Sequence, residues 1–517
     1  MIVLELFDLK KYVGDRLILE LPRLTVYTGD KIGIVGQNGA GKTTLMELLA
    51  GETEPEEGCV RRMCPVSYLR QFSQEQPAPG AVRRFLPGDR LSHERLSGGE
   101  QTRLKIDNAL SRSNCLLLAD EPTSNLDYAG IQMLIKQLKS AETLIVISHD
   151  RALLDAVCNR ILEIRDGVVT DFTGNYSAYA RQNQAALERA ELEYRQYAQE
   201  RARLQQAIVG TREKAKSIRK APKRMGNSEA RLHKRVSTEI TEKLHKSTRA
   251  LESRLDRLEQ KEKPREQPRI QLDFSRTDPP QNKIVLSCRS LTFGYGDHLL
   301  FQNAGFGIRN HTRTAVIGEN GAGKTTLFRL IAEGNSAISC APKARIGYFR
   351  QEFENLDDNQ TILQNALAHS VQRENTVRTI LARLLFRGDT VQKKAAVLSG
   401  GEKIKLSLAQ LLVSDMNVLL LDEPTNYLDL PSIEAVQQIL SDYPGVLLFI
   451  SHDQSFVDTV ANRLLLIENK GLRAFDGNLS DYQSQAKVPR PKPDAAQRMV
   501  LETRLARIVS ELSMPGV

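Results

Sequence analysis

The sequence predicts an α/β protein in which two copies of one phosphate-binding domain are joined by a long antiparallel pair of α-helices. Three observations indicate this architecture. The segment GQNGAGKTTL at 36–45 recurs as GENGAGKTTL at 318–327. The segment LSGGE occurs at 96–100 and again at 398–402. Between the two copies, leucine and tyrosine residues recur at intervals of seven, a spacing that is typical of paired helices.

Length and composition are those of an ordinary multidomain globular protein. The chain has 517 residues, too many for a single hydrophobic core, with 41% apolar and 26% charged residues. No apolar run approaches the roughly 18 residues that span a bilayer, and the N-terminal segment lacks the layout of a signal peptide. The six cysteines form no CxxC pair, which favours reduced thiols over a zinc site or a disulfide framework. We therefore expect no membrane domain and a cytoplasmic location.

The remaining motifs recur in the same order, which indicates a tandem duplication. DEPTSNLD at 120–127 recurs as DEPTNYLD at 422–429, and ISHD at 147–150 recurs at 450–453. The copies are called the first repeat and the second repeat below.

The expected domains follow from these motifs and from the helical composition between them. They are the first repeat at 1–176, a basic hairpin at 177–282 with its tip near 216–230, the second repeat at 283–486, and a short C-terminal extension at 487–517. Each helix of the hairpin is expected to have roughly 35 to 40 residues, on the order of 50 to 60 Å at 1.5 Å per residue.

The GxxxxGKT pattern in each repeat is a P-loop, which binds nucleotide phosphates. Its glycines let backbone N–H groups approach phosphate oxygens at the N-terminus of a helix, where the helix dipole favours anions. We expect Lys42 and Lys324 to contact the β- and γ-phosphates, and Thr43 and Thr325 to ligate Mg²⁺. The predicted nucleotide-binding residues of the loops are Gly36, Asn38, Gly39, Gly41, Lys42, Thr43 and Thr44, and Gly318, Asn320, Gly321, Gly323, Lys324, Thr325 and Thr326.

Two acidic residues follow a strand-like apolar run in each repeat. Burying a carboxylate is costly without a partner, so the core cannot explain these acids. We expect Asp120 and Asp422 to lie near Mg²⁺, and Glu121 and Glu423 to orient or activate the attacking water.

A histidine ends a further apolar run in each repeat. His149 and His452 could be structural residues at strand ends. Their recurrence at matching positions favours a second interpretation, in which they sense the γ-phosphate.

A P-loop, a glutamine, LSGGE, an Asp-Glu pair and a histidine in this order resemble the ATP-binding-cassette ATPases. In that family, two cassettes stack head to tail, and each ATP lies between the P-loop of one cassette and the LSGGE of the other. The resemblance therefore implies a first site that combines Lys42, Gln71, Glu121 and His149 with Ser399 and Gly401. It implies a second site that combines Lys324, Gln351, Glu423 and His452 with Ser97 and Gly99.

The same resemblance extends the predicted sites. Gln71 and Gln351 would act in catalysis and as Mg²⁺ ligands. Tyr12 and Tyr295, about 30 residues before the P-loop lysines, match the aromatic residue that stacks on adenine, although each could instead be a partly buried residue at a strand edge. The LSGGE residues expected to contact ATP are Ser97, Gly98, Gly99 and Glu100, and Ser399, Gly400, Gly401 and Glu402. Because both sites keep every predicted catalytic and nucleotide-binding residue, we expect both to hydrolyse ATP with Mg²⁺.

Positive charge is concentrated in the predicted hairpin. Residues 201–250 contain 15 Lys and Arg against 4 Asp and Glu, a balance of +11, whereas the whole chain carries +9. A localised excess of this kind indicates a polyanionic partner. Residues 198–273 contain no Phe, Tyr or Trp, which argues against base stacking and favours contacts with the phosphates of folded RNA. The alternative is a solvated charged hairpin.

Three functions suit such an ATPase: the energising subunit of a membrane transporter, a DNA-associated ATPase, and a ribosome-binding translation ATPase. Paired cassettes on one chain, a charged helical linker of about 80 residues and the segment EPTNYLD look like the ABC-F family. The resemblance implies a monomer with intramolecular cassette pairing. Its linker would enter the ribosomal exit site and approach large-subunit rRNA, P-site tRNA and the peptidyl-transferase centre.

The tip residues would then make the RNA contacts. Those expected on RNA phosphates are Lys216, Arg219, Lys220, Lys223, Arg224 and Arg231. Met225 is the candidate for approaching the drug site, although it could equally brace the turn.

Within ABC-F, some members are housekeeping translation factors and others protect ribosomes from antibiotics. Only 24 residues separate Gln71 from Leu96, which leaves no room for the arm insertion of several housekeeping members. The tip KAPKRMGNSEARLHK looks like that of the group resistant to lincosamides, pleuromutilins and streptogramin A. The C-terminal extension, with Leu501, Leu505, Ile508 and Leu512 on one helical face, resembles an extension common in that group, although a packing helix is the simpler interpretation. We therefore expect ribosomal protection, with a housekeeping factor as the alternative.

Overall fold

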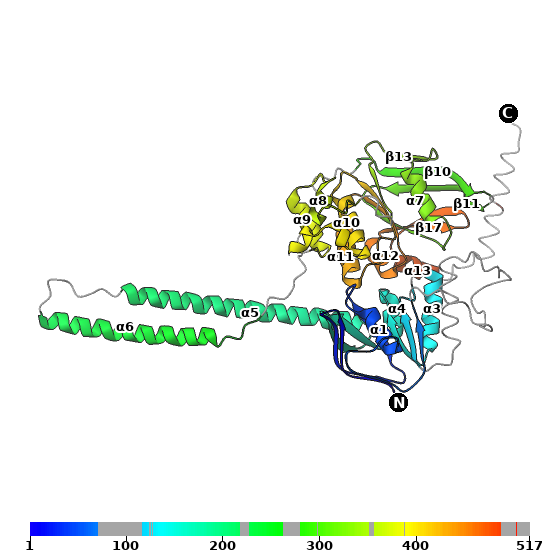
Figure 1. Cartoon of the computed structure of the whole chain (residues 1–517). Coiled ribbons are helices and arrows are strands. Elements are labelled where there is room, and N and C mark those ends of the chain that lie inside the picture. Colours follow the sequence, from blue (N-terminus) through cyan, green and yellow to red (C-terminus); the bar gives the residue numbers. More distant parts are fainter. Residues whose placement is uncertain are drawn as a thin grey trace. The chain divides into compact units, whose positions relative to one another are not determined.

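The computed structural model describes most of the chain. The described residues are 1–70, 116–123, 126, 128–217, 227–261, 280–296, 298–350, 356–386, 388–487 and 503. They fall into two compact units, Met1–Asp171 with Ile270–Val517, and Phe172–Arg269. The first unit contains the two repeats, and the second contains the helical hairpin (Figure 1). The predicted fold class is confirmed, while the sequence-based boundaries at 176 and 282 stay predictions.

Among the described residues, the first repeat is built on a nine-stranded sheet in the order β4-β1-β2-β9-β8-β3-β7-β6-β5. The strands are β1 (Ile2–Val13), β2 (Arg16–Tyr27), β3 (Lys31–Gly36), β4 (Glu57–Arg62), β5 (Val66–Leu69), β6 (Leu116–Asp120), β7 (Thr143–Ile147), β8 (Arg160–Arg165) and β9 (Val168–Thr173). The helices include α1 (Lys42–Ala50), α3 (Tyr128–Ser140) and α4 (Arg151–Val157). Strands β5, β6, β7, β3 and β8 are parallel. Every residue of β6 and β7 is buried, as expected for parallel strands that are covered on both faces.

The described part of the second repeat has the same parallel core, in a sheet of order β14-β15-β16-β12-β17-β18, and a separate sheet of order β11-β10-β13. The strands are β10 (Ile284–Tyr295), β11 (His298–Arg309), β12 (Arg313–Ile317), β13 (Ile338–Cys340), β14 (Ile346–Phe349), β15 (Val418–Asp422), β16 (Val446–Ile450), β17 (Arg463–Glu468) and β18 (Gly471–Asp476). The helices are α7 (Lys324–Ala332), α8 (Ile362–Leu367), α9 (Glu374–Arg383), α10 (Gly400–Val413), α11 (Leu430–Asp442), α12 (Gln454–Val460) and α13 (Leu479–Lys487), with short 3₁₀ helices η1 (Gly388–Gln392) and η2 (Ala395–Val397). In both repeats the predicted chemical residues follow the carboxyl ends of parallel strands, which is where ligands bind in such sheets.

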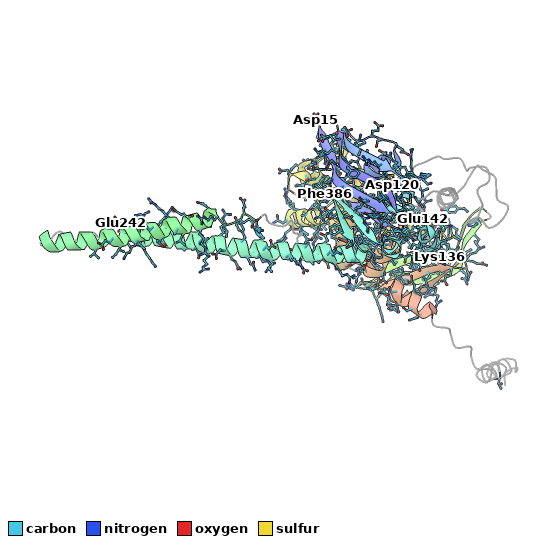
Figure 2. All side chains as sticks on the ribbon, turned by 90° about the horizontal axis from the view of Figure 1, so that it is seen from below. Asp15, Asp120, Lys136, Glu142, Glu242 and Phe386 are labelled. Atoms are coloured by element: carbon cyan, nitrogen blue, oxygen red, sulfur yellow. The ribbon has the colours of Figure 1, made fainter. Side chains whose placement is uncertain are left out.

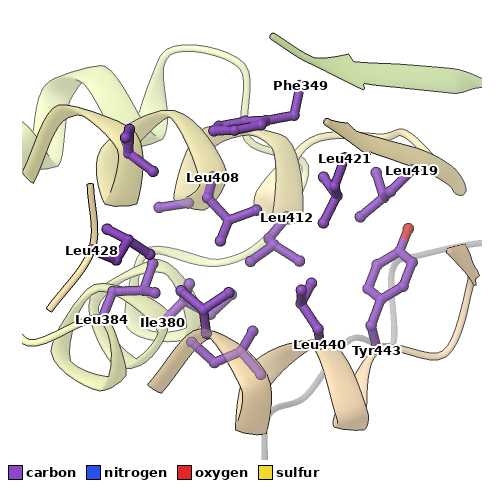
Figure 3. Packing of buried hydrophobic residues seen from close by; sticks show 14 of the residues in the cluster. Phe349, Ile380, Leu384, Leu408, Leu412, Leu419, Leu421, Leu428, Leu440 and Tyr443 are labelled. Carbon is purple, nitrogen blue, oxygen red and sulfur yellow. The ribbon is translucent and has the colours of Figure 1, made fainter. Parts of the chain in front are cut away.

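An apolar core fixes α10 of the second repeat. Leu408 and Leu412 of α10 pack with Ile380 of α9, Leu440 of α11 and Leu421 of β15 (Figure 3). All five side chains are buried. This packing matters for function, because the N-terminus of α10 carries the second LSGGE segment.

The hairpin consists of α5 (Tyr176–Ser217), with 42 residues, and α6 (Asn227–Asp256), with 30. The first helix is longer and the second shorter than the sequence predicts. Ion pairs show that the helices run antiparallel: Arg212 with Glu252 at 2.6 Å, Arg254 with Glu200 at 3.7 Å, and Lys261 with Glu193 at 3.6 Å (Figure 1).

The bend of the hairpin lies outside the described residues. It contains the predicted RNA contacts Arg219, Lys220, Lys223, Arg224 and Met225. Lys216 lies in the last turn of α5. Arg231 lies on α6, where only its backbone is described. The C-terminal extension, apart from residues 487 and 503, is also outside the described residues.

Two expectations from composition have different outcomes. No helix in the described ranges is long and apolar enough to cross a membrane. The expectation that every thiol is reduced is wrong, because Cys64 is disulfide-bonded, whereas Cys59, Cys158, Cys288 and Cys340 are free. A disulfide needs no CxxC spacing, so the spacing of the cysteines could not reveal it.

The core of the second repeat provides a test of stability. Phe449 is fully buried on β16, and its ring lies edge-on to that of Phe456 at 5.6 Å. We expect Phe449→Ala to lower the free energy of unfolding by about 3 to 5 kcal/mol, because it removes apolar contacts and leaves a cavity. The midpoint of urea unfolding, followed by circular dichroism, measures this change. Val397→Ala is the control, since Val397 is 70% exposed, and equal midpoints for the two variants would contradict the described core.

Candidate nucleotide-binding sites

Each P-loop lies between a parallel strand and the helix that follows it. Nζ of Lys42 donates hydrogen bonds to the carbonyl oxygens of Gly36 at 2.8 Å and Gln37 at 3.1 Å. Lys324 makes the equivalent two bonds at the same distances. Burial lowers the pKa of Lys42, while the neighbouring carboxylates of Glu121, Asp429 and Asp120 oppose that shift. Both lysines therefore lie over their loops, where the phosphates of a nucleotide would bind.

Glycine is required immediately before each P-loop helix. Gly41 and Gly323 have φ of 96° and 97°, the left-handed region that favours glycine. An added Cβ would lie 2.8 Å from the side chain of Ile18 at the first position and 3.0 Å from Phe301 at the second. The other predicted residues of the loops are in the same segments: Gly36, Gly39 and Thr44, and Gly318, Asn320, Gly321 and Thr326.

The predicted metal ligands meet in both repeats. The Thr43 hydroxyl donates to Oδ2 of Asp120 at 3.1 Å, and Asp120 lies inside the first repeat (Figure 2). The Thr325 hydroxyl likewise hydrogen-bonds Asp422. Burial raises the pKa of both aspartates. A hydroxyl beside a carboxylate is a donor set that suits Mg²⁺, and the cation would offset the cost of the buried negative charge.

The predicted glutamate and histidine lie together in each repeat. Oε2 of Glu121 accepts a hydrogen bond from the backbone N–H of His149 at 3.4 Å, and its Oε1 lies 3.3 Å from Nε2 of the same histidine. The corresponding distances for Glu423 and His452 are 3.3 and 3.2 Å. Burial lowers the pKa of His149 to about 3, so its contact with Glu121 is not an ion pair at neutral pH.

Both glutamates have an unusual backbone conformation. Their φ angles are 47° and 49°, in the left-handed region that costs a non-glycine residue about 1 to 3 kcal/mol. Hydrogen bonds to the end of the adjacent strand hold them there, from the N–H of Glu121 to the oxygen of Ile147 and from the N–H of Glu423 to that of Ile450, both at 3.0 Å. This conformation turns each carboxylate toward the histidine.

Residues of the second repeat lie against the first P-loop. The backbone N–H of Asn38, in the first P-loop, donates to Oδ2 of Asp429 at 3.0 Å, and its Nδ2 donates to the oxygen of Tyr427 at 2.9 Å. An added Cβ on Gly401 would lie 3.2 Å from Asn38 Nδ2. The structure thus brings the start of α10 beside the first P-loop.

Ser399 and Glu402 form a capping box at the start of α10. Oγ of Ser399 accepts from the N–H of Glu402 at 3.3 Å, and Oε2 of Glu402 accepts from the N–H of Ser399 at 2.9 Å. The box fixes Gly400 and Gly401 in the first turn, at the positive end of the helix dipole. That end can bind a phosphate.

Six of the predicted nucleotide-site residues lie outside the described ranges, and the role predicted for two tyrosines is untested. Outside the described residues are Gln71, Gln351, Ser97, Gly98, Gly99 and Glu100. Tyr12 is partly buried at the end of β1, where its N–H donates to Glu56, and Tyr295 is 50% exposed beside Phe293. Adenine stacking by both tyrosines stays a prediction.

Asp429 joins the two repeats, a contact that the sequence interpretation missed. Its Oδ1 caps α11 by accepting from the N–H of Ser432 at 3.0 Å, while its Oδ2 binds Asn38 of the other repeat. The signal was present, since Asp429 ends the repeated DEPTNYLD motif and an aspartate before a helix favours a cap. A helix cap can be predicted from this motif, but its contact with the other repeat cannot.

Both sites should lose activity as the pH drops. Burial raises the pKa of Glu121 to about 8 and that of Glu423 to about 7. Activation of water requires the deprotonated carboxylate, so activity should fall as the pH drops through these values. We expect this fall in kcat/KM for ATP both in Glu423→Gln, where the first site works alone, and in Glu121→Gln, where the second site works alone. A flat profile in this range, or loss of all activity in only one of the two variants, would contradict two active sites that use these carboxylates.

Comparisons with known proteins agree with this geometry. A family model described as "ABC transporter" matches residues 19–80 and 301–426. The chain is 32% identical to "Ribosome protection protein VmlR" of Bacillus subtilis (strain 168), over 99% of this chain and 93% of the relative. It is 34% identical to "Erythromycin resistance ATP-binding protein MsrA" of Staphylococcus epidermidis, over 86% of this chain and 93% of the relative.

A solved structure supports the fold. The crystal structure of the complex of archaeal ribosomal stalk protein aP1 and archaeal ribosome recycling factor aABCE1 aligns with a TM-score of 0.60 at 20% identity, over 94% of both chains. The match to full-length relatives and the paired P-loop domains lead to one conclusion: the chain belongs to the ABC-F family of ATP-binding-cassette ATPases.

Proposed function

We propose that this ATPase binds the ribosome at the exit site and inserts its hairpin toward P-site tRNA and the peptidyl-transferase centre, where it displaces large-subunit antibiotics. The proposed drug classes are lincosamides, pleuromutilins and streptogramin A. The observation that carries the proposal is a basic cavity on the shaft of the hairpin, which is the part formed by α5 and α6. It is called the shaft cavity below. The similarity to a ribosome protection protein along 99% of the chain supports the proposal.

The cavity lies between α5 and α6, near the bend, and has a volume of about 380 Å³. It is lined by Arg212, Ala215, Lys216, His245, Thr248, Arg249 and Glu252. Its only carboxylate, that of Glu252, is paired with Arg212 at 2.6 Å. Lys216 and Arg249 have no ion-pair partner among the described residues, so their charges are available to an RNA phosphate. This part of the hairpin is therefore suited to the RNA backbone even without the tip.

The nucleotide sites supply the switch. ATP bound between the first P-loop and the start of α10 would strengthen the closed arrangement that Asn38 and Asp429 already make. We propose that Thr43, Asp120 and Gln71 hold Mg²⁺ in the first site, and Thr325, Asp422 and Gln351 in the second. The cation would neutralise charge that develops on the phosphates.

The glutamate and histidine pairs perform the remaining chemistry. Glu121 and Glu423 orient and activate the attacking water, and His149 and His452, held within 3.4 Å of the glutamates, contact the γ-phosphate. Loss of the γ-phosphate removes one contact between the repeats. The closed state then weakens, and the hairpin can withdraw.

The protein should stay on the ribosome when it binds ATP and cannot hydrolyse it. We expect the Glu121→Gln, Glu423→Gln double variant to co-sediment with ribosomes in ATP, because hydrolysis is blocked while closure is not. The amount of protein that pellets through a sucrose cushion measures this. Lys42→Ala, Lys324→Ala is the control and should stay in the supernatant. Absence of the double variant from the ribosome pellet, with recovery on membrane vesicles instead, would favour a transporter subunit.

Charge in the shaft cavity should determine RNA affinity. We expect Lys216→Glu, Arg249→Glu to lose ribosome binding and to keep basal ATP hydrolysis, since both residues belong to the hairpin and neither is part of a nucleotide-binding motif. Each lost phosphate contact should lower the slope of log affinity against log salt by about 1. The matched control is Arg195→Glu, Arg203→Glu, which reverses two exposed arginines of α5 that pair with Glu191 and Glu200 outside the cavity. Equal binding by the two variants would show that the cavity does not contact RNA.

The same variants distinguish a ribosomal protection protein from a housekeeping translation factor. Expression of the wild-type chain in a sensitive host should raise the inhibitory concentration of a lincosamide or a pleuromutilin, and Lys216→Glu, Arg249→Glu should not. If the wild-type chain binds ribosomes and the inhibitory concentrations stay unchanged, a housekeeping translation factor becomes the better interpretation.

A further inference from the structure

A polar cluster joins the repeats next to the catalytic histidines. In each repeat an aspartate follows the histidine and caps the next helix: Asp150 accepts from the N–H of Leu153, and Asp453 from that of Phe456, both at 3.0 Å. The two aspartates affect each other across the interface. Burial raises the pKa of Asp150 to about 6, and the charge of Asp453 contributes to that rise. Two buried carboxylates therefore face a shared region.

Arg151 brings a positive charge to this region. It is the first residue of α4, and its guanidinium lies 3.4 Å from Glu434 of α11 in the other repeat. This is a contact between charges and not a hydrogen bond, because Nε and Nη2 of Arg151 have no hydrogen-bond partner among the described residues. The side chain of Arg151 is only 15% exposed. Burial raises the pKa of Asp453 as well, and the charge of Arg151 opposes that rise, which places this arginine near the second aspartate too.

The ion pair acts on a helix that already contacts the first nucleotide site. Glu434 lies five residues after Asp429, which binds the N–H of Asn38 in the first P-loop. Arg151 lies two residues after His149, which contacts Glu121. The Arg151–Glu434 pair thus connects the segment that carries the histidine of the first site to the helix whose cap contacts the P-loop of the same site.

The second site has no corresponding ion pair. The repeats are offset by 303 residues at ISHD and by 302 at DEPT, so Gln454 takes the place of Arg151 and Gln132 takes that of Glu434. Two neutral amides cannot form an ion pair. Nε2 of Gln454 is buried and has no hydrogen-bond partner in the part of the chain that the structure describes.

We propose that Arg151 and Glu434 are positioning residues that keep the first nucleotide site closed for longer than the second. An ion pair that is partly withdrawn from water must break before α11 can leave the first P-loop, whereas the equivalent movement at the second site breaks no such pair. Nucleotide then leaves the second site first, and the two repeats separate in two steps. The proposal concerns the ATPase itself and holds whether or not the chain binds ribosomes.

The rate at which trapped nucleotide is released tests this order. The Glu121→Gln, Glu423→Gln protein is loaded with a fluorescent ATP analogue and chased with excess ATP. Two phases are expected, and Lys324→Ala, which empties the second site, should leave only the slow phase. Arg151→Gln should accelerate the slow phase about fivefold, as expected for a partly buried ion pair, and leave the fast phase unchanged. A single phase in the starting protein, or equal acceleration of both phases, would overturn the proposal.

Further variants separate positioning from a general loss of stability. Glu434→Gln should have the same effect as Arg151→Gln, and combining them should add nothing, because either change removes the pair. Gln132→Glu with Gln454→Arg installs the pair at the second site and should slow the fast phase. Arg309→Gln is the control, since it removes an ion pair with Asp476 at 3.3 Å inside the second repeat. If the transplanted pair slows neither phase, a purely structural role for Arg151 is the better explanation.

Discussion

A hydrogen bond to one carboxylate, that of Asp429, joins the two repeats at the first P-loop. Burial opposes its ionisation, yet hydrogen bonds from Ser432 and Asn38 and the charge of Lys405 keep the pKa of Asp429 below its ordinary value. The group therefore stays charged throughout the neutral range. One of its oxygens satisfies the N-terminus of α11, and the other satisfies an N–H of the opposite P-loop. A helix cap inside one repeat is thus also a contact between repeats, so any movement of α11 is transmitted to the first nucleotide site.

The apolar cores make this transmission possible. Strands β15 and β16 are buried almost throughout, and they hold Glu423 and His452 at their carboxyl ends. The same packing fixes α10, whose first turn faces Asn38. Because close-packed interiors deform little, we expect ATP to act mainly at the surface between the repeats. Among the described residues, that surface carries polar contacts of Asn38 with Asp429, Arg151 with Glu434 and Gln483 with Tyr128.

The sequence predicts the chemistry inside each repeat better than the contacts between repeats. Lys42, Glu121 and His149 could be assigned because repeated motifs follow apolar strands, and the carboxyl ends of parallel strands meet at one edge. The roles of Asp429 and Arg151 could not be assigned, because they depend on the facing surface of the other repeat, which no local pattern encodes. The hairpin shows a similar limit. Heptad spacing predicts two helices, but α6 ends at Asp256, where the densely charged segment that follows offers little apolar surface for packing.

The connection between β9 and α5 is short. Only two residues separate the end of β9 from the start of α5. Gly174 has φ of 111°, and the side chain of Asn175 accepts from the N–H of Ala178 at 3.1 Å, so the chain turns directly into the helix. Phe172 of β9 then packs edge-on against Tyr179 of α5, with ring centroids 5.1 Å apart. A short, capped and packed connection of this kind cannot absorb a rotation. A helix of 42 residues is on the order of 60 Å long, so a rotation of a few degrees at β9 would displace the far end by several ångströms. Under the proposed function, a movement of that size would change which RNA phosphates Lys216 and Arg249 reach, so that small changes at the nucleotide sites would control the proposed contact with RNA.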